Sequence, residues 1–266
     1  MTGHCRPMPS NSPGSPRLFA PPGADCATCA LREQTLPAGR CVPGDVCLTA
    51  PSGRQIDRFL RRNPEYAEAC LADPFWERRA IAVRHAPIEA VRPLARDPDE
   101  VVRRAVATRL PGSELERLMR DPDHEVRVTV AARLPPDRLR GLLHDPDYRV
   151  RQQVARRIAH GILPRLADDP EREVRKEVAR RLPSFALSRM ADDEDPEVRR
   201  IVAARALPEL AARLLVDADW LVRLEAARRA PRTALAGLAD DPEPEVRALA
   251  ARRLAGTEEI TQEDEP

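Results

Sequence analysis

The chain has 266 residues, of which 33% are charged and only 3% are aromatic. The charges cancel to a formal net charge of +1, which argues against a globally basic nucleic-acid binder and against an acidic disordered chain. With so few aromatic residues, any core must be built from Ala, Val and Leu. No stretch approaches the roughly 18–20 apolar residues of a membrane span, so we expect no membrane insertion.

Residues 1–20 are rich in Pro, Ser and Gly and hold no apolar segment of the signal-peptide type. We expect this segment to be disordered and the protein to be cytoplasmic. Because disulfides are rare in the cytosol, the clustered cysteines that follow need another explanation.

Four cysteines lie within residues 21–50, in the pattern Cys26-x₂-Cys29-x₁₁-Cys41-x₅-Cys47. The surrounding Pro and Gly favour turns, and such a segment would not stay ordered without a cross-link or a metal. A Cys-x₂-Cys pair lets two thiolates of one turn reach the same ion or cluster, and the later pair closes the site. We therefore predict a small metal-binding domain built on these four cysteines.

The cysteine spacing alone does not decide whether the site binds Zn²⁺ or an iron–sulfur cluster. Zinc sites favour two Cys-x₂-Cys pairs or Cys/His mixtures, whereas a cubane cluster accepts more uneven spacing because four iron corners must be reached. Two disulfides in a secreted protein are a third interpretation. Cys5 lies outside the spacing, and we do not assign it to the site.

Residues 51–72 have the pattern of a degenerate first repeat or cap. Cys70 falls where Leu94, Leu118 and Leu142 lie in later copies, so we predict a buried core thiol.

Residues 73–255 contain a strict 24-residue repeat. Asp recurs without insertion or deletion at 73, 97, 121, 145, 169, 193, 217 and 241. An Arg follows each Asp by six residues, and Val immediately precedes that Arg in seven copies, whereas Arg78 breaks the pattern in the first. Apolar residues follow this Val position by four and by eight, ending with Ala250 and Leu254 in the last copy. This spacing predicts one amphipathic helix of roughly twelve residues per repeat. Asp-Pro-Asp/Glu begins it and Pro commonly ends it, although the sequence leaves open which acid is the cap.

The remaining ten or so residues of each repeat carry an apolar pair three apart, as in Leu115/Leu118 and Leu139/Leu142. The segment is too short for a second full helix, and we predict a turn or two of 3₁₀ helix. Neither helix can bury its stripe alone, so the repeats must stack. The fold class is therefore all-α, an α-solenoid of eight 24-residue repeats.

The recurrent Asp and Arg predict a structural ladder between repeats rather than a partner-binding comb. A second Arg recurs twelve residues after each Asp, with His85 in the first copy, at a helix end where a cation suits the dipole. The tail, residues 256–266, is acidic, and we expect it to be disordered.

The unit Asp-Pro-Asp-x-x-Val-Arg…Ala-x-Arg-Leu-Pro…Leu-x-x-Leu resembles the leucine-rich repeat variant (LRV) family over about residues 49–255, and its Asp-x₅-Arg spacing is similar to that of HEAT repeats. The resemblance implies a right-handed superhelix. Some family members carry a four-cysteine [4Fe–4S] domain before the repeats, which implies a [4Fe–4S] cluster on Cys26, Cys29, Cys41 and Cys47. The pattern departs at Glu194, Ala218, Ala159 and Leu207, which replace Pro.

Catalytic signatures are scarce: the sequence has no Gly-rich phosphate loop, and its five His are scattered. We predict no catalytic residue, no small-molecule substrate and a non-enzymatic iron–sulfur protein whose solenoid binds a protein partner, with the cluster in redox or as a structural cap. The alternative is a nucleic-acid-binding, Arg-rich solenoid with a structural zinc or iron–sulfur cap. Mixed charge on the concave face of the solenoid would favour a protein partner, and a continuous positive stripe there would favour nucleic acid.

Overall fold

A computed structural model describes residue 23 and residues 25–256. The segments expected to be disordered therefore lie outside the described residues, except for Gly256. The chain divides into two compact units, residues 1–133 and 134–266, and each is described by itself. Among the described residues, regular structure is helical apart from one isolated antiparallel bridge between Val42 and Val46.

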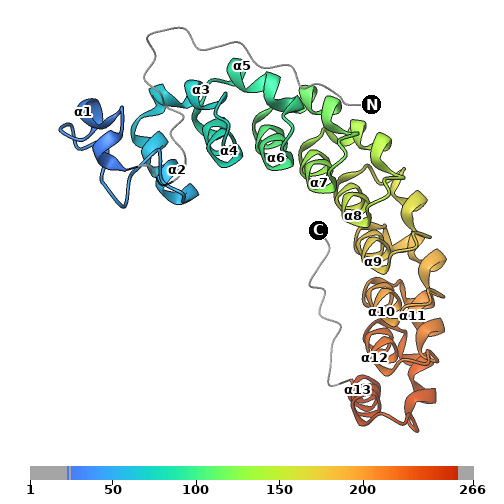
Figure 1. Ribbon diagram of the computed structural model, residues 1–266. Helices are drawn as coiled ribbons and strands as arrows, with labels where there is room; N and C mark the ends of the chain where they lie inside the picture. The colour runs from blue at the N-terminus through green and yellow to red at the C-terminus, as the bar shows by residue number, and fades with distance from the viewer. Residues whose placement is uncertain (1–22, 24, 257–266) are drawn as a thin grey trace, which may run out of the picture. The chain divides into compact units, whose positions relative to one another are not determined.

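In the first unit, ten-residue helices lie side by side in one layer and short helices form the other (Figure 1). α2 packs against α4, α4 against α6, and α6 against α7. The elements are η1 (Cys26–Thr28), α1 (Arg32–Thr35), α2 (Gly53–Arg62), η2 (Pro64–Tyr66), α3 (Ala67–Cys70), α4 (Trp76–His85), α5 (Ile88–Val91), η3 (Arg92–Arg96), α6 (Glu100–Arg109), η4 (Gly112–Leu118) and α7 (His124–Arg133).

The second unit repeats this two-layer plan. α8 packs against α9, α9 against α10, α10 against α12, and α12 against α13. The elements are η5 (Pro136–Leu142), α8 (Tyr148–Arg157), η6 (Leu163–Leu166), α9 (Arg172–Arg181), η7 (Ser184–Met190), α10 (Pro196–Arg205), α11 (Pro208–Leu214), α12 (Trp220–Arg229), η8 (Arg232–Leu238) and α13 (Pro244–Ala255).

The predicted apolar stripe forms the core of the repeats. In α6, Val102, Val106 and the following Leu110 are fully buried, as is Leu115 of η4. The long helices before α13 have ten residues rather than about twelve, and the residue after the repeat helix lies in extended backbone, as at Leu110 (ψ 143°). A following Pro favours this conformation in most copies, but α8 and α10 end at the same position although Ala159 and Leu207 replace that Pro. α13 runs to Ala255 and ends at Gly256 with φ 75°. One stripe residue differs from expectation: Leu254 is 46% exposed, since no further repeat among the described residues covers it.

The predicted 3₁₀ helix is confirmed in η4, η5, η6, η7 and η8. In the first copy the 3₁₀ helix η3 is present, but the one-turn α-helix α5 precedes it. The prediction is wrong in the copy that begins at Asp193, where the short segment is the α-helix α11. The α11 sequence Pro-Glu-Leu-Ala-Ala-Arg-Leu consists, after its proline, of strong α-helix formers, which explains the difference.

The structure also shows which acid caps the long helices. The second acid is the N-cap: Asp99 Oδ1 accepts hydrogen bonds from the amides of Val101 (2.9 Å) and Val102 (3.4 Å). The first acid closes the preceding turn, since Asp97 Oδ1 accepts from the Asp99 amide at 2.9 Å. Where Glu takes the second position, as at Glu171 and Glu243, the side chain makes no capping bond.

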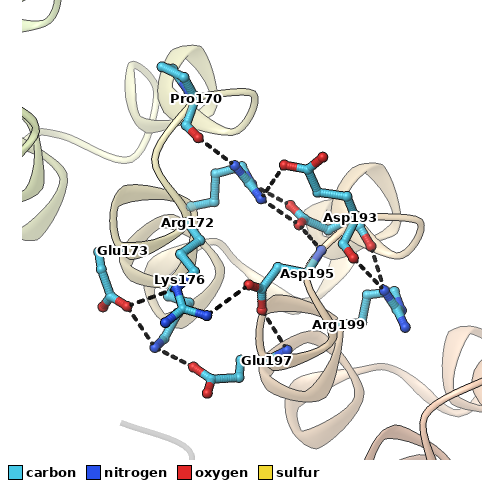
Figure 2. A network of polar contacts seen from close by, with 10 residues as sticks. Pro170, Arg172, Glu173, Lys176, Asp193, Asp195, Glu197 and Arg199 are labelled. Carbon is cyan, nitrogen blue, oxygen red and sulfur yellow. Dashed lines mark hydrogen bonds and ion pairs between the residues drawn. The ribbon is translucent and has the colours of Figure 1, made fainter.

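The first acid also receives the Arg of the preceding repeat, and we call this series the Asp–Arg ladder. Arg103 donates from Nε and Nη2 to the two carboxylate oxygens of Asp121 at 2.7 and 2.9 Å, while its Nη1 donates to the Asp97 carbonyl at 2.9 Å. Figure 2 shows the rung at Asp193 and the backward bond from Arg199 to the Asp193 carbonyl. The structural interpretation of the recurrent pair is confirmed. The rungs are Arg79–Asp97, Arg103–Asp121, Arg151–Asp169, Arg175–Asp193, Arg199–Asp217 and Arg223–Asp241.

The second recurrent Arg makes a different contact, which the sequence does not reveal. Arg205 Nη1 donates to the carbonyls of Ala179 (2.7 Å) and Leu182 (2.8 Å), at the end of the preceding long helix. Carbonyls at a helix end have no partner within the helix, so this Arg satisfies them from the neighbouring repeat. The same contact is made by Arg109, Arg133, Arg181 and Arg253.

At the first Asp of the ladder, Asp73, the ion-pair partner is Arg78. The position that would supply an Arg to Asp73 is occupied by Gln55, 24 residues before Arg79. Arg78 of the same helix instead donates from Nη1 to Asp73 Oδ2 at 2.6 Å, and both side chains are fully buried. Cys70 lies beside this pair with no exposed surface, and burial raises its pKa to about 12, so the prediction of a buried core thiol is confirmed.

Candidate functional site

Cys26 and Cys29 lie on one tight turn. Asp25 caps η1, its side chain accepting a hydrogen bond from the Ala27 amide at 3.2 Å. The Cys29 amide then donates to the Cys26 carbonyl at 3.4 Å, and the Cys29 carbonyl accepts from Arg32 at the start of α1. The Cys-x₂-Cys spacing thus places two thiols on one turn, as predicted.

Cys41 and Cys47 flank the Val42–Val46 bridge. The Val42 amide donates to the Val46 carbonyl at 2.9 Å, and the reverse bond measures 2.8 Å. Gly44 takes φ 79° in the turn between them, a left-handed conformation that glycine adopts without strain. Because the two cysteines stand just outside the paired residues, they lie next to each other at the open end of the hairpin.

In the structure, Cys26, Cys29 and Cys47 lie in the neighbourhood of Cys41, near enough to influence its pKa. Cys41 is 8% exposed, and Cys26, Cys29 and Cys47 are partly exposed. The pKa of Cys41 is raised, first by burial, against a lowering hydrogen bond from Thr35, and further by the nearby Cys47, Cys26 and Cys29 thiols. The five cysteines of the described residues are free thiols. Within residues 23 and 25–256, no three His, Cys, Asp or Glu side chains converge closely enough to hold one ion.

The domain is fastened to α2 by polar contacts from both of its halves. The Cys47 amide donates to the Gln55 carbonyl at 3.3 Å, and the Gln55 side chain donates to the Gly44 carbonyl. Asn63, fully buried at the end of α2, donates from Nδ2 to the Arg40 carbonyl at 3.0 Å. Four thiols held together repel one another once ionised, and a cationic metal or cluster relieves that repulsion. The donor set therefore fits a metal or an iron–sulfur group.

The long helices of the second unit carry a shallow groove of about 500 Å³ on their exposed side. Its walls hold both signs of charge: Lys176, Arg180 and Arg200 alternate with Glu197 and Glu225, over a floor that includes Ile201. The cations are paired, with Lys176–Glu197 at 2.6 Å and Arg200–Glu225 at 3.6 Å. Figure 2 shows Lys176 between Glu173 and Glu197. This groove is mixed in charge and has no continuous positive stripe.

One histidine has a role that the sequence did not show. His85, one of the five scattered histidines, lies with its Nε2 3.0 Å from Asp57 Oδ1 of α2. His85 occupies the position at which later repeats have the second recurrent Arg, which donates to backbone carbonyls of the preceding long helix. In the first repeat, the contact between His85 and Asp57 links α4 to α2 instead. The described part of the chain contains no helix with the length and apolar character to cross a membrane.

Comparison with known proteins identifies both parts of the chain. The family model for the LRV protein FeS4 cluster matches residues 23–69, and the leucine-rich repeat variant model matches residues 101–123, 124–147 and 172–195. The first match makes the cysteine region an iron–sulfur cluster domain, and it extends beyond the predicted domain end at residue 50.

Two relatives are similar in sequence. A solved structure described as a leucine-rich repeat variant with a novel repetitive structural motif is 55% identical, covering 86% of this chain and 98% of its own, with a TM-score of 0.83. An uncharacterized 27.7 kDa protein in the nifB 3' region of Rhodobacter capsulatus is 42% identical over 92 residues, which are 35% of this chain and 37% of the relative's length. On the identity and coverage of the solved relative, this chain belongs to the leucine-rich repeat variant family.

Proposed function

We propose that this protein is a non-enzymatic [4Fe–4S] protein, with Cys26, Cys29, Cys41 and Cys47 as ligands and a repeat solenoid that docks a protein partner. The observation that carries the proposal is that the free thiols of Cys26, Cys29 and Cys47 lie near enough to Cys41 to raise its pKa, in a domain built on turns and a single bridge. Four thiolates are the usual ligand set of such a cluster.

The partly exposed thiols suit a redox role. A bound cluster supplies one-electron transfer, and its exposure to solvent and to a docked protein sets how readily electrons cross. Cys41 is buried, whereas Cys26, Cys29 and Cys47 reach the surface, so three of the four ligands would bring one side of the site within reach of a partner. A purely structural cap needs no such exposure, which is why we favour the redox role.

The test is the metal content of protein purified without oxygen. We expect four iron and four sulfide per chain, no zinc, and a broad absorption band near 400 nm. Single Ser variants of the four ligand cysteines should each lose most of the iron. Cys70→Ala is the matched control, since the Cys70 thiol is buried in the core, and it should keep the full complement. Cys5→Ser should also keep it, because Cys5 lies outside the ligand spacing of the sequence. One zinc per colourless chain would refute the cluster.

A protein partner is favoured by the charge of the repeat surface. The groove cations are neutralised by neighbouring acids, and the ladder arginines are engaged by Asp carboxylates or backbone carbonyls. Nucleic-acid binding by counterion release needs cations free to meet phosphates. The alternative is tested by fluorescence anisotropy with single- and double-stranded DNA and RNA at 50 and 200 mM salt. We expect no saturable binding; micromolar binding that weakens steeply with salt would support the nucleic-acid alternative.

A further inference from the structure

We propose that Thr49 tunes the cluster by donating a hydrogen bond from its hydroxyl to the ligand sulfur of Cys47. The proposal rests on the proposed function, because it needs Cys47 as a cluster ligand. The Thr49 Oγ1 lies 3.3 Å from Cys47 Sγ, within the range for a hydrogen bond to sulfur. Cys47 Sγ is the one partner found for this hydroxyl in the described part of the chain.

The segment that carries Thr49 is held firmly. Val46, Leu48 and Ala50 are buried on both sides of it, and Thr49 itself is only 4% exposed. The Thr49 carbonyl accepts a hydrogen bond from the Gly23 amide at 2.8 Å, which ties the first described residue of the domain to the turn that carries Thr49. Because its backbone and neighbours are fixed and the side chain is buried, the hydroxyl has few alternatives to the sulfur.

The direction of the bond follows from the chemistry of the ligand. A free thiol and a hydroxyl can each act as donor, but a cysteine that binds iron has lost its proton and can only accept. When the cluster is bound, Thr49 must therefore be the donor. Hydrogen bonds to cluster sulfurs stabilise the more negative, reduced state and raise the reduction potential.

Two other threonines near the site show why Thr49 is distinct. The Thr28 hydroxyl, between Cys26 and Cys29, donates to the Asp25 carbonyl at 3.1 Å. The Thr35 hydroxyl lies beside Cys41, but it also donates to the Leu31 carbonyl at 2.8 Å, so its single proton is shared. Of these three threonines, only Thr49 has a hydroxyl proton for which a cysteine sulfur is the one acceptor found in the described part of the chain.

The experiment measures the midpoint potential of the loaded, full-length protein by an anaerobic titration followed by absorption and electron paramagnetic resonance. Thr49→Val should shift the potential to a more negative value, Thr49→Ser should stay near the wild type, and Thr28→Val should not move it. Iron and sulfide content is measured for each variant. A fully loaded Thr49→Val protein with the wild-type potential would overturn the assignment.

Loading separates this inference from the proposed function. Wild-type protein without iron and sulfide would refute the cluster itself, whatever Thr49 does. If Thr49→Val fails to load, Thr49→Ala removes the same hydroxyl without adding bulk and is titrated in its place. Loss of loading in the Val and Ala variants but not in the Ser variant would support the bond, since the hydroxyl is what these variants lack. Equal loss in all three would contradict it.

Discussion

The repeats and the cysteine domain are ordered by opposite means. In the repeats the long helices are fixed by side chains of neighbouring repeats, through the apolar stripe, the Asp–Arg rungs and the Arg side chains on carbonyls of the preceding helix. The domain formed by residues 23–50 has one bridge, two very short helices and few buried apolar residues: Leu31, Cys41, Val46, Leu48 and Ala50. A segment of this size cannot bury enough surface to fold alone.

From this comparison we infer that the two regions have separate sources of stability: contacts between neighbouring repeats stabilise the solenoid, and the bound cluster stabilises the cysteine domain. A substitution that removes one Asp–Arg ion pair of the ladder should lower the free energy of unfolding of the repeats and leave the iron content unchanged. Loss of the cluster should unfold the cysteine domain and leave the repeats folded. The four predictions that follow test this separation, from the largest expected effect to the smallest.

The largest effect is expected in the first full repeat, at Arg78 of α4. Arg78→Leu leaves the Asp73 carboxylate buried without its ion-pair partner, and breaking a buried pair in this way costs about 3–5 kcal/mol. Urea denaturation followed by circular dichroism measures the loss. The double variant Arg78→Leu/Asp73→Leu is the control, since it buries no unpaired charge and should recover most of the stability. A single variant as stable as the wild type would show that the pair is dispensable.

A rung within the array should cost less. Arg151→Ala removes the two bonds to Asp169, at 2.7 and 2.9 Å, and we expect a loss of about 1.5–3 kcal/mol, typical of hydrogen bonds to charged groups. Arg247 is the matched control: it bonds the carbonyls of Asp241 and Pro242, but no carboxylate partner is found for it among the described residues. Arg247→Ala should cost distinctly less. Equal losses would mean that the carboxylate bonds contribute little.

The N-caps should contribute a smaller amount. Asp219→Ala removes the bonds to the amides of Leu221 and Val222, and losing a cap costs about 0.5–2 kcal/mol. Glu171 occupies the same position of another repeat without a capping bond, so Glu171→Ala should be nearly neutral. Thermal unfolding of both variants measures the difference, which should vanish if the acid acts only through its charge.

The smallest effect is a dependence on pH. The hydrogen bond from Arg223, opposed by burial, lowers the pKa of Asp241 below its ordinary value of 3.8. The stability that this carboxylate contributes is therefore present above about pH 4 and is lost as the pH falls through the lowered pKa. Denaturation between pH 6 and pH 3 should show a steeper acid loss for the wild type than for Arg223→Met. Parallel curves would contradict the assignment.

The structure of the repeats could be predicted from the sequence because each contact recurs every 24 residues. The stripe, the ladder and the 3₁₀ helices follow from that period, and the exceptions fall at altered residues, such as Leu207 before α11. The contact of the second Arg was missed because its partners are backbone carbonyls, which leave no mark on the sequence. The same is true of the choice of capping acid, which depends on backbone geometry. At Arg78 the sequence showed a break in the pattern, but not its partner.

The cysteine domain could be predicted from the sequence only through the spacing of its four cysteines. Four cysteines predict a metal site, yet the sequence does not show that Cys41 is the buried one or that the Val42–Val46 bridge brings Cys41 beside Cys47. Thr49 was missed because a single threonine two residues after a cysteine has no distinguishing pattern. In a non-repeating domain each contact occurs once, and only the folded chain reveals it.

Hydrogen–deuterium exchange of the cluster-loaded and cluster-free protein tests the separation of the two regions most directly. We expect the amides of residues 25–50, such as those of Val42 and Val46, to be protected in the loaded protein and to exchange rapidly once the cluster is removed. The amides of α4 to α13 should be equally protected in both forms. Protection of residues 25–50 that survives removal of the cluster, or loss of protection throughout the repeats, would contradict the account.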